Sequence, residues 1–429
     1  MSTSTALERC GQRASPAEAK PKSLTIRAAT VLGIGSMIGA AIFALLGEAG
    51  AVARAAVWIS FLIGGIVAGP LGYVCAKLGM RFPSSGGLIT YLIKGFGEGR
   101  LVGIASWLGY TAAIVIVTAM VTVAFGGYAT SLFVGTHASG AWNNLFITLL
   151  ILGMVAINLV GAKFVANAQS LIVACVALTF FAYLGFNVIT FTAGDLRKPA
   201  HDLPRAMTYA LSIIALTYVL IAIGVFGTLT THEVIEYGET AIAEAVRPTL
   251  GGAGFTIMAI VALLSTAGCT NATLYASGNP TGQLAKTGLF PQIFGENSRL
   301  GRHAGLLITA GLVLIVANLV DLSAIASVGS AVSLMVFLLV GIAGWRRRAD
   351  ANSNPVIVAA AIAVIGIALV SFAVNTIQTA PDTFTAIILL GLLAIALDAI
   401  VRRRHHHHPT PRPPATRPTV EHPASAPTH

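Results

Sequence analysis

Hydrophobic and polar positions follow one another in long blocks along this chain, and not at the short periods of a soluble helix or strand. Apolar runs of about 18 or more residues with few charges recur between residues 25 and 401. We expect each run to form a membrane-crossing helix, because about 20 helical residues span the hydrocarbon core of a bilayer. The pattern predicts eleven spans, at about 25–47, 56–79, 101–133, 142–162, 170–193, 206–229, 252–276, 304–320, 322–345, 355–377 and 382–401.

The polar blocks at the two ends divide the chain into three parts. Residues 1–24 form a polar arm with four cations and no separate apolar region, so we expect no cleavable signal and a cytoplasmic N-terminus. Residues 25–401 form the membrane domain. Residues 402–429 are rich in Pro, Thr and charge, which predicts a disordered cytoplasmic tail.

Composition and charge exclude a soluble or nucleic-acid-binding protein. The chain is 55% hydrophobic and 10% charged with a mean hydropathy of +0.82, whereas a soluble domain is about 25% charged. The net charge of +10 reflects topology. If both termini are cytoplasmic, all of the 26 Lys and Arg except Arg54 and Arg247 fall inside, which predicts the cytoplasmic membrane as the location and no nucleic-acid partner.

That topology needs two crossings between Lys163 and Arg197, and the segment is too short for them. As one helix, residues 164–196 would extend about 50 Å, whereas two crossings need about 40 residues and a turn. With a single crossing, every later loop would change sides, and most Lys and Arg residues after this segment would move to the outer face. We therefore expect either a re-entrant or truncated piece near 164–175 or a chain that lacks residues there.

The first predicted span contains the phrase GIGSMIGAAIF, residues 33–43. Gly35 and Gly39 have the GxxxG spacing that lets two membrane helices approach closely, which favours simple packing. Alternatively, Gly33 and Gly35 unwind the helix near the midplane and leave amide groups free to hold a carboxylate. A second glycine-interrupted phrase, FFAYLGF at 180–186, gives the second interpretation a partner.

Four ordered phrases resemble the amino acid–polyamine–organocation permeases. They are GIGSMIGAAIF at 33–43, RFPSSGGLITYL at 81–92, TFFAYLGFNVITFTAGDLRKPAHDLPRAM at 179–207 and STAGCTNATLYASGNPTGQLAKTGLFP at 265–291. The resemblance implies an all-α polytopic membrane fold of two inverted five-helix repeats with discontinuous first and sixth helices. It also implies twelve spans, so most of the fifth helix is missing here.

The resemblance places an amino acid substrate where the two broken helices meet. It implies unwinding at Gly33, Gly35 and Gly185, and substrate contacts from Ser36, Gly39, Ala40, Ala41, Phe181, Ala182, Leu184 and Asn187. Ala41 stands where the family pattern has glycine, which narrows the carboxylate site. Asn187 stands where many relatives have an acid.

Charge along the spans restricts the substrate and the coupling ion. The predicted spans hold almost no ionisable side chain at depth, so a neutral amino acid fits better than a cation or polyamine. Ser265 and Thr266 could complete a sodium site, but such hydroxyls usually bond to their own helix. Coupling to protons or to sodium therefore stays open, and no metal site or cofactor is expected.

Two other classes were weighed against a secondary transporter. An enzyme is not expected, because no HExxH, GxSxG or phosphate-cradling motif is present at a suitable place. A non-transporting relict, or a membrane-resident interaction protein of the same fold, remains the alternative because of the missing crossing.

Overall fold

The computed structural model describes residues 25–40, 42, 43, 46, 49, 57–84, 86–97, 99–135, 139–160, 186–191, 196, 198–295, 301–379 and 381–407. Its helices are α1 Ile26–Ala40, α3 Val57–Arg81, α4 Leu88–Phe96, α5 Arg100–Tyr110, α6 Val117–Phe133, α7 Gly140–Val160, α9 Phe186–Phe191, α10 Pro199–Thr228, α11 Thr231–Tyr237, α12 Ala241–Lys286, α13 Ala304–Leu319, α14 Leu322–Arg346, α15 Pro355–Thr379 and α16 Pro381–His407. A π-helical segment, η3 Thr111–Ile116, joins α5 to α6, and single 3-10 turns lie at Gly238–Thr240, Gln292–Phe294 and Gly301–His303.

The described helices confirm the predicted all-α, polytopic membrane class. Eight of them are long and apolar enough to cross a bilayer, and α13 is a shorter apolar helix. The bounds agree to within two residues for six predicted runs, 56–79, 101–133, 142–162, 304–320, 322–345 and 355–377, and the run at 170–193 lies mostly outside the described residues. α12 is two helices joined at Gly251, whose φ of 61° breaks the helix, so the predicted span from 252 starts at this bend. α16 continues to His407, so the first residues of the predicted tail are helical.

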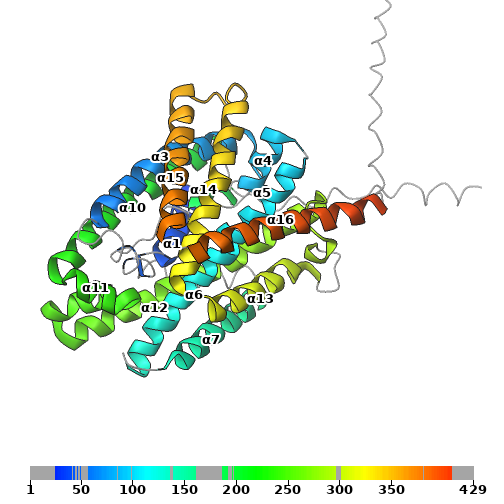
Figure 1. Cartoon of the computed structure of the whole chain (residues 1–429). Helices are drawn as coiled ribbons and strands as arrows, with labels where there is room; N and C mark the ends of the chain where they lie inside the picture. Colours follow the sequence, from blue (N-terminus) through cyan, green and yellow to red (C-terminus); the bar gives the residue numbers. More distant parts are fainter. Residues whose placement is uncertain are drawn as a thin grey trace, which may run out of the picture.

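The span made by α5, η3 and α6 lies at the centre of the bundle (Figure 1). It runs from Arg100 to Phe133, and 72% of its most apolar window is buried, against 17% for the span in α7. At its π-helical turn two threonines bond to their own helix: the Thr111 and Thr118 hydroxyls donate to the Trp107 and Ile114 carbonyls at 2.9 and 2.6 Å. Such a turn frequently marks a functional position in a helix.

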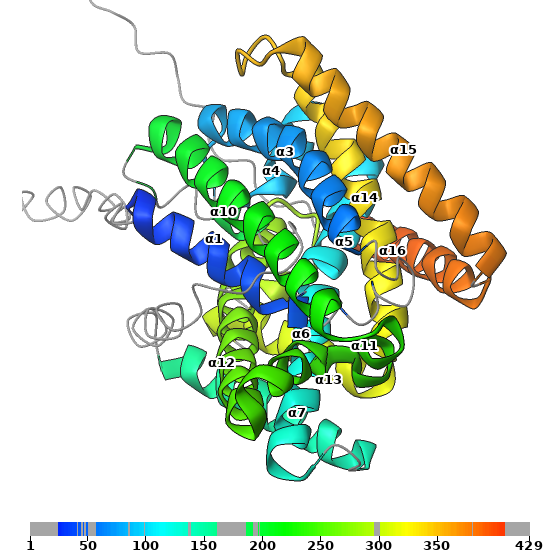
Figure 2. The ribbon, with the colours of Figure 1, turned by 90° about the vertical axis from the view of Figure 1, so that its left-hand side faces the viewer.

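Around this centre, α1, α10 and α3 lie side by side, as Figure 2 shows. α15 packs on α14 and α3, and α16 packs on α5. The outward faces of these helices carry exposed aliphatic residues, for example Ile66, Leu216, Ile367 and Leu389. A bilayer would cover such a surface, since soluble monomers rarely expose so much contiguous apolar area.

The segment after α12 is anchored to the central span by aromatic rings. Phe290 stacks on Trp107 with ring centroids 3.9 Å apart and planes at 17°, and Phe294 meets both rings edge-on. Tyr110 meets Phe290 edge-on, and its hydroxyl shares a hydrogen bond of 2.8 Å with Thr309 of α13. These contacts fix α12 and α13 against α5.

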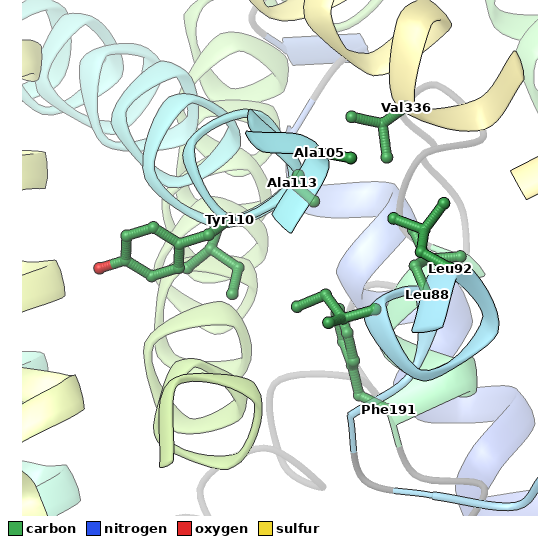
Figure 3. A pocket seen from close by; sticks show the side chains of 10 residues that line it. Leu88, Leu92, Ala105, Tyr110, Ala113, Phe191 and Val336 are labelled. Atoms are coloured by element: carbon green, nitrogen blue, oxygen red, sulfur yellow. The ribbon is translucent and has the colours of Figure 1, made fainter. Parts of the chain in front are cut away.

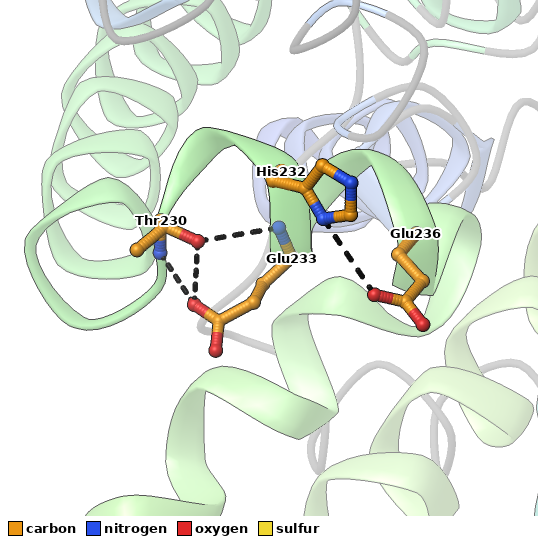
Figure 4. Close-up of polar contacts among 4 residues, drawn as sticks. All are labelled: Thr230, His232, Glu233 and Glu236. Carbon is orange, nitrogen blue, oxygen red and sulfur yellow. Dashed lines mark hydrogen bonds and ion pairs between the residues drawn. The ribbon is translucent and has the colours of Figure 1, made fainter.

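The short helix α11 begins with a reciprocal cap (Figure 4). The Thr230 hydroxyl accepts from the Glu233 amide at 3.3 Å, and the Glu233 carboxylate accepts from the Thr230 amide at 2.7 Å. His232 and Glu236 form a further pair at 3.7 Å on the exposed side of the helix. The hydrogen bonds from Thr230 lower the pKa of Glu233. The cap therefore fixes where this loop helix starts.

Candidate substrate site

The first helix, α1, contacts α9 through a glycine. The resemblance assigns α9 to the sixth helix of the family. A Cβ atom built on Gly33 would collide with the side chain of Ile189 in α9, which is fully buried. The absence of a side chain on Gly33 therefore makes room for the Ile189 side chain. Residues that lie about 150 positions apart in the sequence are thereby brought into direct contact, which agrees with the predicted convergence of the first and sixth spans.

The same stretch of α1 is fixed to α12 by a hydrogen bond. The Cys269 thiol donates to the Ser36 carbonyl at 3.1 Å, and both residues are buried. This hydrogen bond polarises the Ser36 carbonyl toward α12. Sliding of α1 along α12 would break the bond. Ser36 therefore lies at the crossing of α1 and α12, close in sequence to the Gly33 contact with α9.

The two hydroxyls predicted for an ion site have different environments. Thr266 donates to the Ala262 carbonyl at 2.7 Å and so satisfies its own helix. Ser265 is 2% exposed, and its Oγ atom has no hydrogen-bond partner among the described residues. A buried hydroxyl without a partner costs about 1–3 kcal/mol, so Ser265 is the hydroxyl that is available to a ligand.

Most other polar side chains of α12 serve its own backbone. Thr270, Thr273, Ser277 and Thr281 each donate to a carbonyl three or four residues earlier, at 2.6 to 2.9 Å. Asn271 is different, because it accepts a hydrogen bond of 2.7 Å from Asn158 of α7. The sequence analysis missed this buried link, although two asparagines inside apolar spans were a signal for it.

Buried carboxylates lie near helix ends and have partners. Asp202 accepts from the Lys198 amide at 3.2 Å and contacts His201 at 2.9 Å, Glu244 pairs with Arg247 at 2.7 Å, and Asp398 pairs with Arg402 at 2.9 Å. Asp202 and Asp398 belong to α10 and α16, and Glu244 lies in the first turn of α12, before the bend at Gly251. Between Gly251 and Lys286, α12 has no charged residue, and α9 has none either, so the described residues where α1, α9 and α12 meet are uncharged.

A narrow apolar cavity lies between α9, α4, α14 and the central span (Figure 3). Phe191 of α9 and Leu88 and Leu92 of α4 face Ala105 and Ala113 of the central span across it, with Val336 of α14 at the rim. The hydroxyl of Tyr110 points away from the cavity in Figure 3, toward its bond with Thr309. The wall therefore offers only dispersion contacts. No sequence motif predicts this cavity, because its lining comes from four separate stretches of the chain, at 88–92, 105–114, 191 and 336.

Phe191 reaches the cavity because of a second close approach. Gly87, with a φ of 50°, precedes α4, and a Cβ there would collide with the Phe191 ring. The turn before α4 is held by Ser84, whose hydroxyl accepts from the Gly86 amide and from the Thr90 hydroxyl, both at 3.0 Å. The motif at 81–92 thus packs against the C-terminal end of α9.

One sequence expectation is wrong in the described residues. Gly33 and Gly35 were expected to unwind the first span, but α1 is helical through both and up to Ala40. Glycine lowers helix propensity by about 1 kcal/mol, yet in an apolar bundle the helical hydrogen bonds have no competitor, so packing against Ile189 decides. Gly33 acts here as a close-packing residue, whereas the packing role expected for Gly35 and Gly39 stays a prediction.

The other predicted site residues are covered unevenly. The backbones of Gly39, Ala40 and Asn187 lie in α1 and α9 as predicted, and their side-chain environments are outside what the structure describes. Five further calls fall outside the described residues: Ala41, Phe181, Ala182, Leu184 and Gly185. The predicted re-entrant piece near 164–175 also lies outside them.

Comparison with known proteins agrees with the order of the sequence motifs. A model of the amino acid permease family matches residues 24–181 and 172–397, two pieces that overlap within the short segment. The inner membrane transport protein YbaT of Escherichia coli strain K12 is 31% identical over 382 residues, 80% of this chain and 87% of that protein. The serine/threonine exchanger SteT of Bacillus subtilis strain 168 is 27% identical over 293 residues, 58% of this chain and 65% of that protein.

The solved structures include a similar helical transporter. Mhp1, a transporter of the nucleobase-cation-symport-1 family in a closed conformation with bromovinylhydantoin bound, covers 89% of this chain and 93% of its own, with 15% identity and a TM-score of 0.42.

Proposed function

The chain belongs to the amino acid permease family of the amino acid–polyamine–organocation superfamily, and we propose that it carries neutral amino acids across the cytoplasmic membrane by alternating access. One observation carries the proposal: α1 contacts α9 at Gly33 and Ile189 and α12 at Ser36, and α9 also lines an apolar cavity through Phe191. Binding at a helix crossing near the midplane is the usual arrangement in transporters built from repeats.

The substrate class follows from the electrostatics of this convergence. Near the convergence, α9 and the part of α12 between Gly251 and Lys286 provide hydroxyl, thiol and peptide groups but no carboxylate, and the three buried carboxylates farther away have partners. A zwitterion carries its own counter-charge and needs no buried acid, whereas a cationic side chain would need one. The apolar wall at Phe191 suits an uncharged side chain. The relative SteT, a serine/threonine exchanger, supports the same class.

We further propose Ser36, Gly39, Ala40 and Ala41 as the carboxylate side of the site and the segment from Phe181 to Asn187 as the amino-group side. The bare hydroxyl of Ser265 supports a sodium ion as one coupling partner, and proton coupling is the other candidate. The positive-inside pattern supports cytoplasmic termini.

Uptake of labelled amino acids by purified protein in proteoliposomes tests the proposal. Saturable uptake of a neutral amino acid, not reduced by excess arginine or putrescine, is expected. A panel of neutral substrates with no uptake above empty liposomes would contradict it. For coupling, Ser265→Ala should abolish sodium dependence if sodium is used, with Ser330→Ala as the control, since Ser330 bonds to its own helix at 2.7 Å.

A non-transporting relict is the second candidate, because one observation favours it. Residues 164–196 are too short for the two crossings that the charge pattern requires. Labelling of single cysteines at 195–205 and 232–245 from outside separates the topologies. Reactivity at 195–205 would overturn the cytoplasmic assignment of that loop, whereas binding of neutral amino acids without uptake would favour the relict.

A further inference from the structure

A group of cations gathers where three helices end on the same side of the bundle. Lys77 and Arg81 lie at the C-terminal end of α3, and Lys94 lies in the last turn of α4. Arg346 is the last residue of α14, and Arg347 and Arg348 follow it. α14 packs against both α4 and α3, so these residues, which we call the basic cluster, share one corner although they span some 270 positions (Figure 1).

The arginines of the basic cluster are held in place by backbone and rings. Arg347 donates to the Lys94 carbonyl at 2.7 Å, at the last turn of α4, where a helix exposes unsatisfied carbonyls. The Arg346 guanidinium lies 4.4 Å from the centroid of the Phe96 ring. On the other side, Lys77 donates to the Asn352 carbonyl at 3.1 Å. Fixed guanidinium groups lose less entropy when they bind a ligand.

The basic cluster carries more positive charge than its surroundings neutralise. Within the basic cluster, only Arg347 has a carboxylate partner among the described residues, Asp350 at 3.1 Å. Arg81 and Lys94 lie 5.7 and 6.0 Å from the centroid of the Phe82 ring, so two like charges contact one aromatic side chain. These cations are exposed, and their mutual repulsion favours an anion between them.

The position of the basic cluster indicates where that anion comes from. Trp345 is exposed next to the arginines, and aromatic residues of this kind sit at the headgroup level of membranes. Val356, in the first turn of the adjoining α15, is 72% exposed and continues the apolar outer surface from this level. A charged headgroup at the arginines would thus have its acyl chains beside an apolar helix face.

We propose that the basic cluster binds the headgroup of an anionic phospholipid of the adjacent leaflet. The phosphate oxygens accept from Arg346 and Arg348, and the acyl chains lie along the outer face of α15. Planar guanidinium groups suit phosphate because they donate two parallel hydrogen bonds. The phospholipid joins the ends of α3, α4 and α14. Of these, α4 follows the turn at Gly87 that contacts Phe191.

Lipid titration of the full-length protein in neutral detergent tests the site. Phosphatidylglycerol is expected to raise the thermal unfolding temperature and to remain bound in native mass spectra, whereas phosphatidylcholine does neither. In Arg346→Gln/Arg348→Gln the apparent affinity for phosphatidylglycerol should fall about tenfold or more, since each interfacial cation adds to anionic-lipid binding. The control Lys198→Gln/Arg205→Gln removes the same charge from exposed positions that the charge pattern places on the same face, and should bind normally.

Three results would overturn the proposal. They are equal effects of phosphatidylglycerol and phosphatidylcholine, equal loss in the two double variants, and an equal stabilisation by soluble glycerol phosphate, which would indicate a free-phosphate site. If the cluster variant does not fold, the wild-type protein still decides, because phosphatidylglycerol binding must weaken at high salt. Binding is measured without transport, so failure of the permease proposal would not affect this outcome.

Discussion

Replacing Gly33 by alanine should destabilise the protein, and the contact with Ile189 should be the reason. The added methyl group would occupy the space of the Ile189 side chain, which is fully buried in α9. Because isoleucine is branched at Cβ, few rotamers would let it withdraw. The clash therefore has to be relieved by moving α1 and α9 apart.

The magnitude follows from two opposing effects. An extra methyl group in a filled site costs about 1–3 kcal/mol, while alanine in place of glycine inside a helix gains about 1 kcal/mol. Gly224 of α10 isolates the second effect, since nothing lies within 4 Å of a Cβ built there. Gly33→Ala should thus be less stable than Gly224→Ala by about 1–3 kcal/mol, although both changes add the same atoms.

Unfolding in mixed detergent micelles measures this difference, and a double-mutant cycle assigns it. Ile189→Ala alone should cost about 2–5 kcal/mol as a cavity. In that background Gly33→Ala should no longer destabilise, which gives a coupling energy of about 1–3 kcal/mol. If Gly33→Ala and Gly224→Ala have equal stability, or if the cycle shows no coupling, the reasoning about the contact between α1 and α9 is wrong.

Three further predictions concern the bundle around the site. Phe290→Ala should cost about 3–5 kcal/mol in the same unfolding assay, and Phe133→Ala, whose side chain is 70% exposed, should cost far less. Thr230→Ala should speed amide hydrogen exchange in α11 about fivefold, because the cap contributes about 1 kcal/mol. In the unchanged protein, the lowered pKa of Glu233 means that the protection of α11 amides should be complete above the unfolded-state pKa of Glu233. It should be lost as the pH falls through the lower, folded-state pKa. Asp398→Asn should destabilise more than Asp350→Asn in unfolding assays, since only the former leaves a partly buried arginine unpaired.

Hydropathy predicted the helices well because bilayer thickness fixes their length independently of tertiary contacts. The bend at Gly251 divides α12 close to where the predicted run at 252 begins, so the sequence predicted that boundary too. The sequence did not predict that α1 stays helical through its glycines. Glycines at 33 and 35 are compatible with unwinding and with close packing, and the choice depends on Ile189, which no local pattern reveals.

The site was predictable in its helices but not in its contacts. The resemblance placed the first and sixth helices together, and the bond between Ser36 and Cys269 adds α12 to them. Thr266 and Ser265 are neighbours of similar chemistry, yet one is satisfied by its own helix and the other has no partner among the described residues. Their difference depends on which face of α12 meets α1, and sequence spacing alone did not give that orientation.

The central claim is that an amino acid binds where α1 meets α9 and α12, and protection of a cysteine at Ser36 tests it most directly. In a background without the native cysteines, Ser36→Cys should react with a small thiol reagent more slowly in the presence of a transported neutral amino acid. Arginine and putrescine should leave the rate unchanged. Uptake of a neutral amino acid by the same variant, with no change in the labelling rate at any concentration, would contradict this location of the site.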